Sequence, residues 1–190
     1  MSYPNLSALL EAIVYLAKEP VSLDDIHAAV PEVDAIELER TLNELIERYR
    51  SKHHGIEIRE VAGGYRFSTK PEHHEVLKQF IKTQIPPTRL SLAALETLAV
   101  IAYKQPVTVP EIQDIRGVHA SSVIKTLLDK KLITTAGRKE VLGRPILYKT
   151  TKEFLIHFGL KDLAELPSME EFEELIKAQA GAEEEIISPS

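Results

Sequence analysis

Two pairs of adjacent histidines, His53-His54 and His73-His74, are the side chains in this sequence best suited to bind a metal ion. Adjacent side chains diverge, however, and no acidic residue stands near them at a spacing typical of a metal site. The chain has no cysteine, which excludes thiolate zinc sites, disulfides and cysteine nucleophiles. We therefore interpret the pairs as solvated surface histidines and predict that the protein binds no metal.

The pair Asp24-Asp25 has the chemistry for acid–base catalysis, but both residues fall at the start of a helical segment, where acidic side chains are favoured. Phosphate-binding loops and dinucleotide fingerprints are absent from the sequence. Gly63-Gly64 lies between two strand-like runs and not between a strand and a helix. Because no convergent set of catalytic groups is found, we predict a protein that is not an enzyme and needs no cofactor.

The elements that must position these residues occur twice, at an offset of 86 residues. Leu9 to Ile26 reads LLEAIVYLAKEPVSLDDI, and Leu95 to Ile112 reads LETLAVIAYKQPVTVPEI. In each copy an apolar helix stops at a proline, and a capping box, Ser22 to Asp25 or Thr108 to Glu111, opens a second short helix. A repeat this long indicates a domain duplication and not a solenoid.

A third helix follows in each copy, and behind it two strand-like runs around glycines predict a β-hairpin. The boxes Thr69 to Glu72 and Thr150 to Glu153 then predict the start of a closing helix. Three helices with a hairpin form a winged helix. We predict a mostly α fold with small β-hairpin wings (α+β), built from tandem winged-helix domains, with strands at residues 56–61, 65–68, 133–135 and 140–148.

These patterns predict four segments. We expect an N-terminal winged-helix domain at residues 1–85, a Pro-containing linker at 86–90, a C-terminal winged-helix domain at 91–162, and an acidic helix and tail at 163–190. The tail opens with a capping box from Ser168 to Glu171. The N-terminus lacks a signal-peptide pattern and the longest apolar stretch is too short to span a bilayer, so we expect a soluble cytoplasmic protein without a membrane partner.

The net charge of −6 is unevenly distributed: residues 1–85 carry −4, residues 86–162 carry +5 and residues 163–190 carry −7. The third helix of the first copy is acidic, which predicts a poor reader of DNA. In the second copy Lys125, Lys130 and Lys131 outweigh Asp129. We expect at most weak, non-specific DNA binding there, and a DNA-binding winged-helix transcriptional regulator remains the alternative function.

Surplus apolar residues mark the helix from Leu92 to Tyr103, which is apolar almost all round. Val100, Ile101 and Tyr103 add to its core stripe. Two explanations remain open from the sequence. Either a partner, a second copy or the first repeat covers this face, or all of these side chains belong to the core of the domain.

The second repeat closely resembles the bacterial segregation and condensation protein B family, and the resemblance extends over the chain to about Pro167. The residues that carry it are the run LETLAVIAYKQP from Leu95 to Pro106, the turn Ile115-Arg116-Gly117-Val118, the segment Gly143-Arg-Pro-Ile-Leu-Tyr148, and Phe154-Leu155 with Phe158-Gly159-Leu160.

The resemblance implies a non-enzymatic subunit of the bacterial condensin-like complex, which acts in chromosome condensation and partition at cell division and is associated with the nucleoid. Members of the family form homodimers and bind the kleisin subunit, which bridges the ATPase heads of the structural maintenance of chromosomes (SMC) protein. We expect the first repeat to carry self-association and the second to contact the kleisin. The predicted partner-binding residues are Val100, Ile101, Tyr103, Arg116, Arg144, Pro145 and Tyr148.

Overall fold

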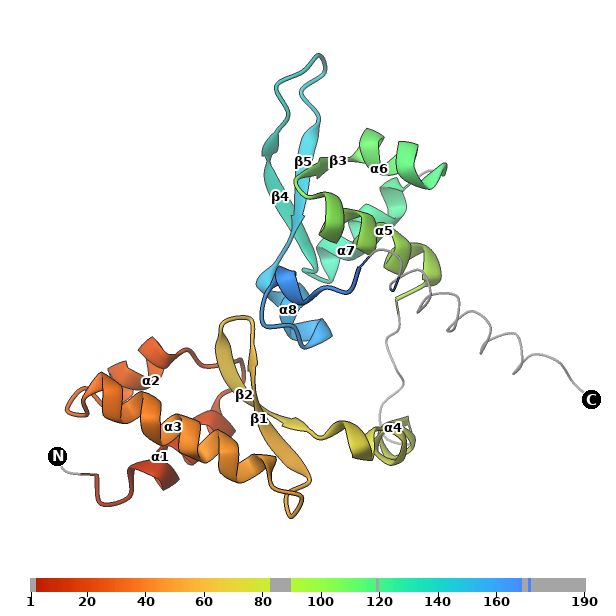
Figure 1. Cartoon of the computed structure of the whole chain (residues 1–190). Helices are drawn as coiled ribbons and strands as arrows, with labels where there is room; N and C mark the ends of the chain where they lie inside the picture. The colour runs from red at the N-terminus through yellow and green to blue at the C-terminus, as the bar shows by residue number, and fades with distance from the viewer. Residues whose placement is uncertain (1–2, 83–89, 119, 169–170, 172–190) are drawn as a thin grey trace, which may run out of the picture. The chain divides into compact units, whose positions relative to one another are not determined.

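The computed structural model describes residues 3–82, 90–118, 120–168 and 171 (Figure 1). Its contacts divide the chain into two compact units, Met1–Leu95 with Thr151–Asp162, and Glu96–Thr150 with Leu163–Ser190. Each unit therefore contains two separate stretches of sequence. The linker expected at residues 86–90 lies, except for Leu90, outside the described residues.

The first unit contains a three-helix core followed by a hairpin and two further helices (Figure 1). The strands of the hairpin are antiparallel, and Ile58 pairs with Phe67. After the hairpin the chain forms a 3-10 turn and then a helix. The elements are α1 (Leu6–Leu16), α2 (Leu23–Ala29), α3 (Ala35–Arg50), β1 (Ile56–Val61), β2 (Gly64–Thr69), η1 (Pro71–His73) and α4 (His74–Lys82), joined by the later helix α8 (Lys152–Phe158).

The second unit repeats this plan with a small additional strand (Figure 1). Its three-stranded antiparallel sheet has the order β3-β5-β4. The prediction of tandem winged helices is thus confirmed. The elements are α5 (Leu92–Lys104), whose first residues group with the first unit, β3 (Val107–Thr108), α6 (Val109–Arg116), α7 (Ser121–Asp129), β4 (Ile133–Arg138), β5 (Ile146–Thr150) and η2 (Leu163–Glu165).

Local capping explains where several helices begin. The predicted capping boxes from Ser22 to Asp25 and from Thr108 to Glu111 are both present, with the hydroxyl accepting from the main-chain N–H three residues on. At the other end of α6, Gly117 has a φ of +69°, in the left-handed region that glycine enters without strain. These signals are local, so they act alike in both copies.

A strand pairing that was not predicted ties each wing to the segment after the first helix. Val21 bridges Tyr65 in the first unit, and Val107 pairs with Tyr148 at the corresponding place in the second. The chain passes so close at the first bridge that a Cβ on Gly64 would lie 2.8 Å from main-chain atoms of Pro20. The duplication is therefore visible in the tertiary contacts as well as in the sequence.

Two predicted starts of closing helices are wrong by one residue or more. Thr69 is the last residue of β2 and pairs with Ile56, and the turn that follows begins after Lys70 without a side-chain cap. Thr150 likewise ends β5, so that Thr151 caps α8 instead. The strand predicted at residues 140–148 begins only at Ile146, because the residues before it form the tip of the wing.

Each unit has its own hydrophobic core. The core of the first unit consists of Leu10, Val14, Ile26, Val30, Leu38, Leu42, Leu45 and Ile58. In the second unit the buried apolar residues include Leu98, Ile101, Val107, Ile112, Ile124, Leu127, Leu132 and Ile133.

Candidate partner-binding surfaces

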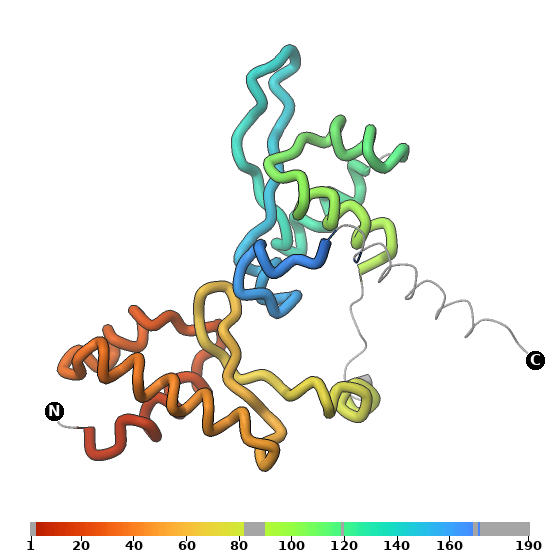
Figure 2. Tube along the Cα trace, viewed as in Figure 1, coloured from red at the N-terminus to blue at the C-terminus, as the bar shows by residue number. Residues whose placement is uncertain are grey.

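The β4–β5 hairpin is the wing of the second unit, and in Figure 2 its tip extends beyond the helices of that unit. At the tip the N–H of Arg144 donates to the carbonyl of Val141 at 2.9 Å. Gly143 has a φ of +85°, as the third position of a type II turn requires. Leu142, at the second position, is completely exposed. The wing thus presents an apolar side chain on a hydrogen-bonded turn.

Leu142 is a candidate contact residue that the sequence analysis missed. Its place between Val141 and Gly143 lay inside a predicted strand, where an apolar residue is expected to be half-buried. The Gly-Arg-Pro that follows is a turn signal, and this signal was sufficient to place Leu142 at a hairpin tip.

Two of the predicted partner-binding residues lie beside this turn. Arg144 is exposed, and its carbonyl accepts from Nη1 of Arg138 at 2.9 Å. Pro145 is half-buried, and its carbonyl accepts from the N–H of Lys139 at 2.9 Å. The main chain of the tip is therefore fixed by the wing itself, while the side chain of Arg144 remains at the surface.

Tyr148 lies further along the wing, in the middle strand of the sheet. It pairs with Val107 on one side and with Thr135 on the other, and its side chain is buried. A contact role for Tyr148 at the surface does not agree with this position. Tyr148 belongs to the wing itself, and its buried side chain supports the hairpin from inside the unit.

The predicted apolar face of α5 is covered by the protein's own chain. Ile101 is completely buried and Val100 is 7% exposed, so both side chains belong to the core and not to an open surface. Tyr103 is half-buried, and its hydroxyl donates to the carbonyl of Pro167. This burial raises the pKa of the Tyr103 hydroxyl. The segment after η2 therefore returns to α5 within the second unit.

Arg116 joins the last turn of α6 to α5. Its guanidinium donates to the hydroxyl of Thr97 at 2.7 Å and to the carboxylate of Glu96 at 2.5 Å. The side chain of Arg116 is 9% exposed and Thr97 is fully buried. These two bonds and the low exposure of the side chain give Arg116 a structural position inside the unit instead of a free surface one.

A second ion pair fixes the wing, just beyond the end of β4, to α6. Nζ of Lys139 lies 2.5 Å from Oε1 of Glu111, whose other oxygen accepts from the N–H and the hydroxyl of Thr108. The hydrogen bonds from Lys139, and then those from Thr108, lower the pKa of Glu111 to about 2. The wing and the start of α6 are therefore held together by a charged network.

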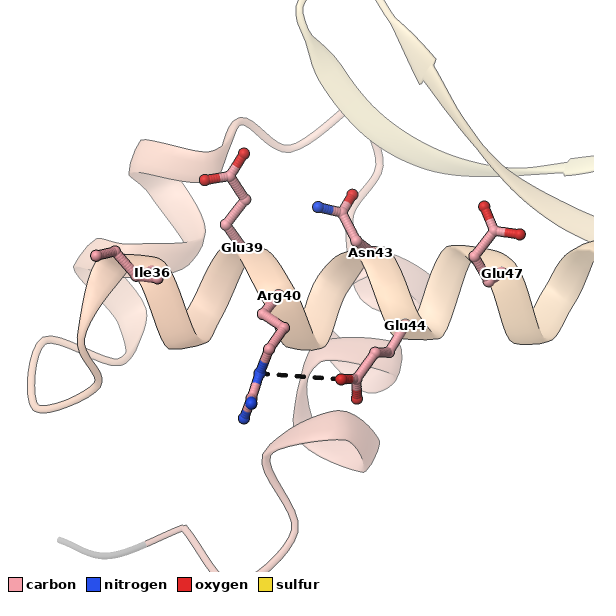
Figure 3. Close-up of a pocket in the computed structure, with 6 residues that line it drawn as sticks. All are labelled: Ile36, Glu39, Arg40, Asn43, Glu44 and Glu47. Carbon is pink, nitrogen blue, oxygen red and sulfur yellow. Dashed lines mark ion pairs between the residues drawn. The ribbon is translucent and has the colours of Figure 1, made fainter.

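The outward face of α3 is acidic. Figure 3 shows Ile36, Glu39, Arg40, Asn43, Glu44 and Glu47 along this face, where they line a shallow pocket. Nε of Arg40 lies 3.9 Å from Glu44, so the cation is shared with a carboxylate. A face of this charge opposes phosphate groups, in agreement with the prediction that the first winged helix reads DNA poorly.

The corresponding helix of the second unit, α7, is different. Ser121, Ser122 and Lys125 are exposed on it, and Lys130 follows at its end. His119, which precedes this helix, lies outside the described residues. Among the described residues, the third helix thus presents exposed lysines in the second copy and mostly glutamates in the first.

One member of a histidine pair and one member of the aspartate pair make contacts that stabilise the fold. His54 stacks on Tyr49 with ring centroids 4.6 Å apart, and Asp25 completes the capping box with Ser22. Across the part of the chain that the structure describes, no group of three histidine, aspartate or glutamate residues is placed to hold a metal ion. In that same part, every helix is too short or too polar to cross a membrane.

The fold and these surfaces define a tandem winged-helix protein. The third helix of each winged helix, here called its recognition helix, is α3 in the first unit and α7 in the second. The first recognition helix is acidic, and the wing of the second unit carries an apolar tip beside an exposed arginine. The chain belongs to the family described as segregation and condensation complex subunit ScpB, whose model matches residues 8–169. The resemblance seen in the second repeat is therefore confirmed.

Curated relatives agree with this assignment. The segregation and condensation protein B of Moorella thermoacetica is 47% identical over 88% of this chain and 84% of its own length. That of Syntrophotalea carbinolica is 44% identical over 93% of this chain and 88% of its own. The protein of the same name from Myxococcus xanthus is 43% identical over 92% of this chain, which spans only 52% of that longer relative.

Solved structures of similar proteins are also known. The crystal structure of ScpB from Mycobacterium tuberculosis is 31% identical, with 84% of this chain and 98% of that chain covered and a TM-score of 0.40. A dimer of the ScpB N-terminal domain complexed with ScpA peptide is 29% identical over 46% of this chain and all of that chain, with a TM-score of 0.39.

Proposed function

We propose that this protein is a non-enzymatic subunit of a bacterial condensin-like complex that acts in chromosome condensation and partition at cell division. The observation that carries the proposal is the family match over residues 8–169. In this role the protein binds the kleisin subunit as a homodimer and reaches the SMC ATPase through the kleisin. One related structure is described as a dimer of the ScpB N-terminal domain complexed with ScpA peptide; we extend its dimerisation to the first repeat of this chain and add a kleisin contact on the second unit.

The proposal divides the work between the repeats. Residues 1–85 carry self-association, residues 91–162 contact the kleisin, residues 86–90 link the two, and residues 163–190 form the tail. The different charges of the two recognition helices support such a division, because each winged helix then offers a different surface to its partner.

The proposed kleisin contact lies at the wing of the second unit. Arg144 and Pro145 keep their predicted roles because they reach the surface, and Leu142 joins them. The other predicted contact residues support this surface from inside the unit and do not touch the kleisin themselves, because each is buried or hydrogen-bonded within the unit. They are Val100, Ile101, Tyr103, Arg116 and Tyr148. An exposed apolar anchor beside an arginine is a combination typical of binding hot spots.

The protein in this role needs no cofactor and catalyses no reaction. It works in the cytoplasm, at the nucleoid. DNA binding as a transcriptional regulator is the second candidate, and the cations of α7 favour it. We place it second because the first recognition helix is acidic, which leaves any contact with DNA weak and non-specific.

Co-purification with the kleisin of the same host, followed by mass determination of the complex, tests the proposal. The expected result is a complex that contains two copies of this chain. Arg144→Glu and Leu142→Glu should each weaken the complex without changing the melting temperature, whereas Lys125→Glu on α7 serves as a matched exposed control. Failure of the unmodified chain to retain the kleisin would overturn the proposal.

A further inference from the structure

Two apolar side chains are exposed where α6 ends. Ile115 is 52% exposed and Val118 is 53% exposed. Between them, Arg116 is bound to Glu96 of α5, and Gly117 turns the chain in the left-handed region. The turn is therefore fixed in place by a structural arginine, and it presents an apolar side chain on each side. We call Ile115 and Val118 the α6 turn patch.

The C-terminal tail begins near the other end of α5. The hydroxyl of Tyr103 donates to the carbonyl of Pro167. The N–H of Ser168 then donates to the carboxylate of Glu171 at 2.8 Å, and the N–H of Glu171 donates to the hydroxyl of Ser168 at 3.2 Å, which is the capping box predicted here. Burial, and then the charge of Glu171, raise the pKa of the Tyr103 hydroxyl. The first turn of a helix thus lies beside Tyr103.

The sequence after Ser168 predicts that this helix is amphipathic. At 3.6 residues per turn, Met169, Phe172, Leu175 and Ile176 fall within about 120° of the helix circumference, and the neighbouring glutamates fall on the opposite arc. We call these four residues the tail stripe. A helix of this length is marginal in water unless its apolar face is packed. The tail stripe therefore requires an apolar surface within its reach.

The length of the tail matches the distance to the α6 turn patch. Tyr103 and Glu96 are seven residues apart on α5, so they lie on one face of the helix and about 10 Å apart along it. A helix that starts at Ser168 and runs antiparallel to α5 covers the same distance in seven residues. It then comes level with Glu96, which the arginine of the turn binds. Leu175 and Ile176 are thus the tail residues that reach the patch.

The size of the patch favours the tail over a separate molecule. A stable interface between two proteins buries about 800 Å² on each partner, and two half-exposed side chains supply only a small part of such an area. The tail, in contrast, is already attached beside Tyr103. Tethering gives it a high effective concentration at the patch, so a small apolar contact is sufficient.

We infer that the tail helix docks on the second unit antiparallel to α5, with Leu175 and Ile176 packed on the α6 turn patch. The glutamates of the helix then face the solvent. The inference does not rest on the proposed function. It assigns an occupant to an exposed surface of the second unit and makes the start of the acidic tail a part of that unit.

A single tryptophan tests the docking. The natural chain has no tryptophan, so Phe172→Trp introduces the only one, on the tail stripe. Its emission maximum should lie at a shorter wavelength than that of Glu174→Trp, on the polar arc, because the docked ring is shielded from water. Adding Val118→Glu to Phe172→Trp should shift the emission to that of the exposed control. A carboxylate buried in the patch should lower the docked population at least about tenfold.

Val141→Glu is the matched control for Val118→Glu, because Val141 is a valine of the same unit and is 49% exposed on the wing. It should leave the emission of Phe172→Trp unchanged. A Phe172→Trp protein that emits like the exposed control would overturn the inference. So would a short-wavelength emission that Val118→Glu does not alter, since the tail would then be docked elsewhere.

Disulfide formation tests the contact independently. Because the natural chain has no cysteine, Val118→Cys combined with Leu175→Cys or with Ile176→Cys introduces the only two thiols. Mild oxidation should close a disulfide within one chain for at least one of these pairs, whereas Val118→Cys with Glu174→Cys should form none. Failure of both pairs would contradict the inference. A disulfide between two chains would also contradict it, because the patch would then hold the tail of a second copy.

These measurements use the full chain alone, so their outcome is separate from that of the proposed function. Retention of the kleisin provides the remaining comparison. If Val118→Glu abolishes this retention and leaves the tryptophan emission unchanged, the patch belongs to the kleisin, and the inference is wrong while the proposed function stands.

Discussion

Nζ of Lys70 donates to the main-chain oxygen of Ser51 at 2.5 Å, and Lys70 is buried, with 5% of the residue exposed, at the C-terminus of α3. The same ammonium donates to the carbonyl of Arg50 at 3.3 Å. A cation at this end of a helix complements the helix dipole and satisfies carbonyls that have no partner within the helix. Lys70, which follows the second strand of the hairpin, thus caps the C-terminus of α3, the longest helix of the first unit.

Lys70→Met should therefore destabilise the first unit, because the aliphatic side chain fills the space but removes the ammonium donor from the carbonyl of Arg50 and leaves the carbonyl of Ser51 with only the N–H of His54. The expected loss is about 1–3 kcal/mol in the free energy of unfolding, measured by urea denaturation. Lys52→Met is the control, since Lys52 is exposed in the loop that follows α3. Equal stability of the two variants would contradict the capping role of Lys70.

The stability of the second unit should fall in acid through Glu111. Its pKa is about 2 in the folded protein against 4.5 for the ordinary group, so the carboxylate stabilises the fold above pH 4.5 and this contribution is lost as the pH falls toward 2. Glu111→Gln should flatten the pH dependence of the melting temperature in that range. Because the side chain is 40% exposed, solvent screening keeps the effect modest. A variant with the same pH dependence as the natural chain would contradict this prediction.

Ile101→Glu and Leu142→Glu should separate core from surface. A carboxylate at the fully buried position 101 has no partner and should lower the stability by several kcal/mol, with a collapse of the melting temperature. The same change at the exposed position 142 should alter stability by no more than about 0.5 kcal/mol. Circular dichroism melts of both variants provide the measurement, and a stable Ile101→Glu protein would show that α5 is not core.

DNA binding by the second unit should be weak, sensitive to salt and independent of sequence. Residues 86–162 carry +5 and residues 163–190 carry −7, so deletion of residues 172–190 should raise the affinity for duplex DNA at low salt. This deletion keeps Pro167, which Tyr103 binds. Titrations at two salt concentrations measure the effect, and an unchanged affinity would remove the tail as an electrostatic brake.

Much of the fold could be predicted because its signals are local. The boxes at Ser22 and Thr108 depend on residues three apart, and they appear as predicted. The same pattern failed at Thr69 and Thr150 because each threonine is the last residue of a strand and is fixed by its cross-strand partner. Sheet pairing thus overrode a helix-start signal at the same place in both copies.

The sequence could not show what covers the apolar face of α5, because the covering residues are far away along the chain. An all-round apolar helix has the same pattern whether a partner or its own domain covers it. The group that covers Tyr103 is the carbonyl of Pro167, 64 residues away, and no periodicity within the helix contains that information. Arg144 and Pro145 entered the predicted set through the family resemblance, while the sequence pattern itself placed them inside a strand at residues 140–148 and so missed the turn.

The hydrogen bond from the N–H of Ala62 to the carbonyl of Leu160, at 2.9 Å, has a consequence for how the chain can be divided. Together with the ion pair between Glu60 and Lys161, it binds residues 151–162 to the first hairpin. The first winged helix is therefore completed only after the second has been synthesised. A protease that cuts between residues 83 and 89 should leave two fragments that remain associated, and shortening the gene at residue 85 should yield a product with an unfinished surface.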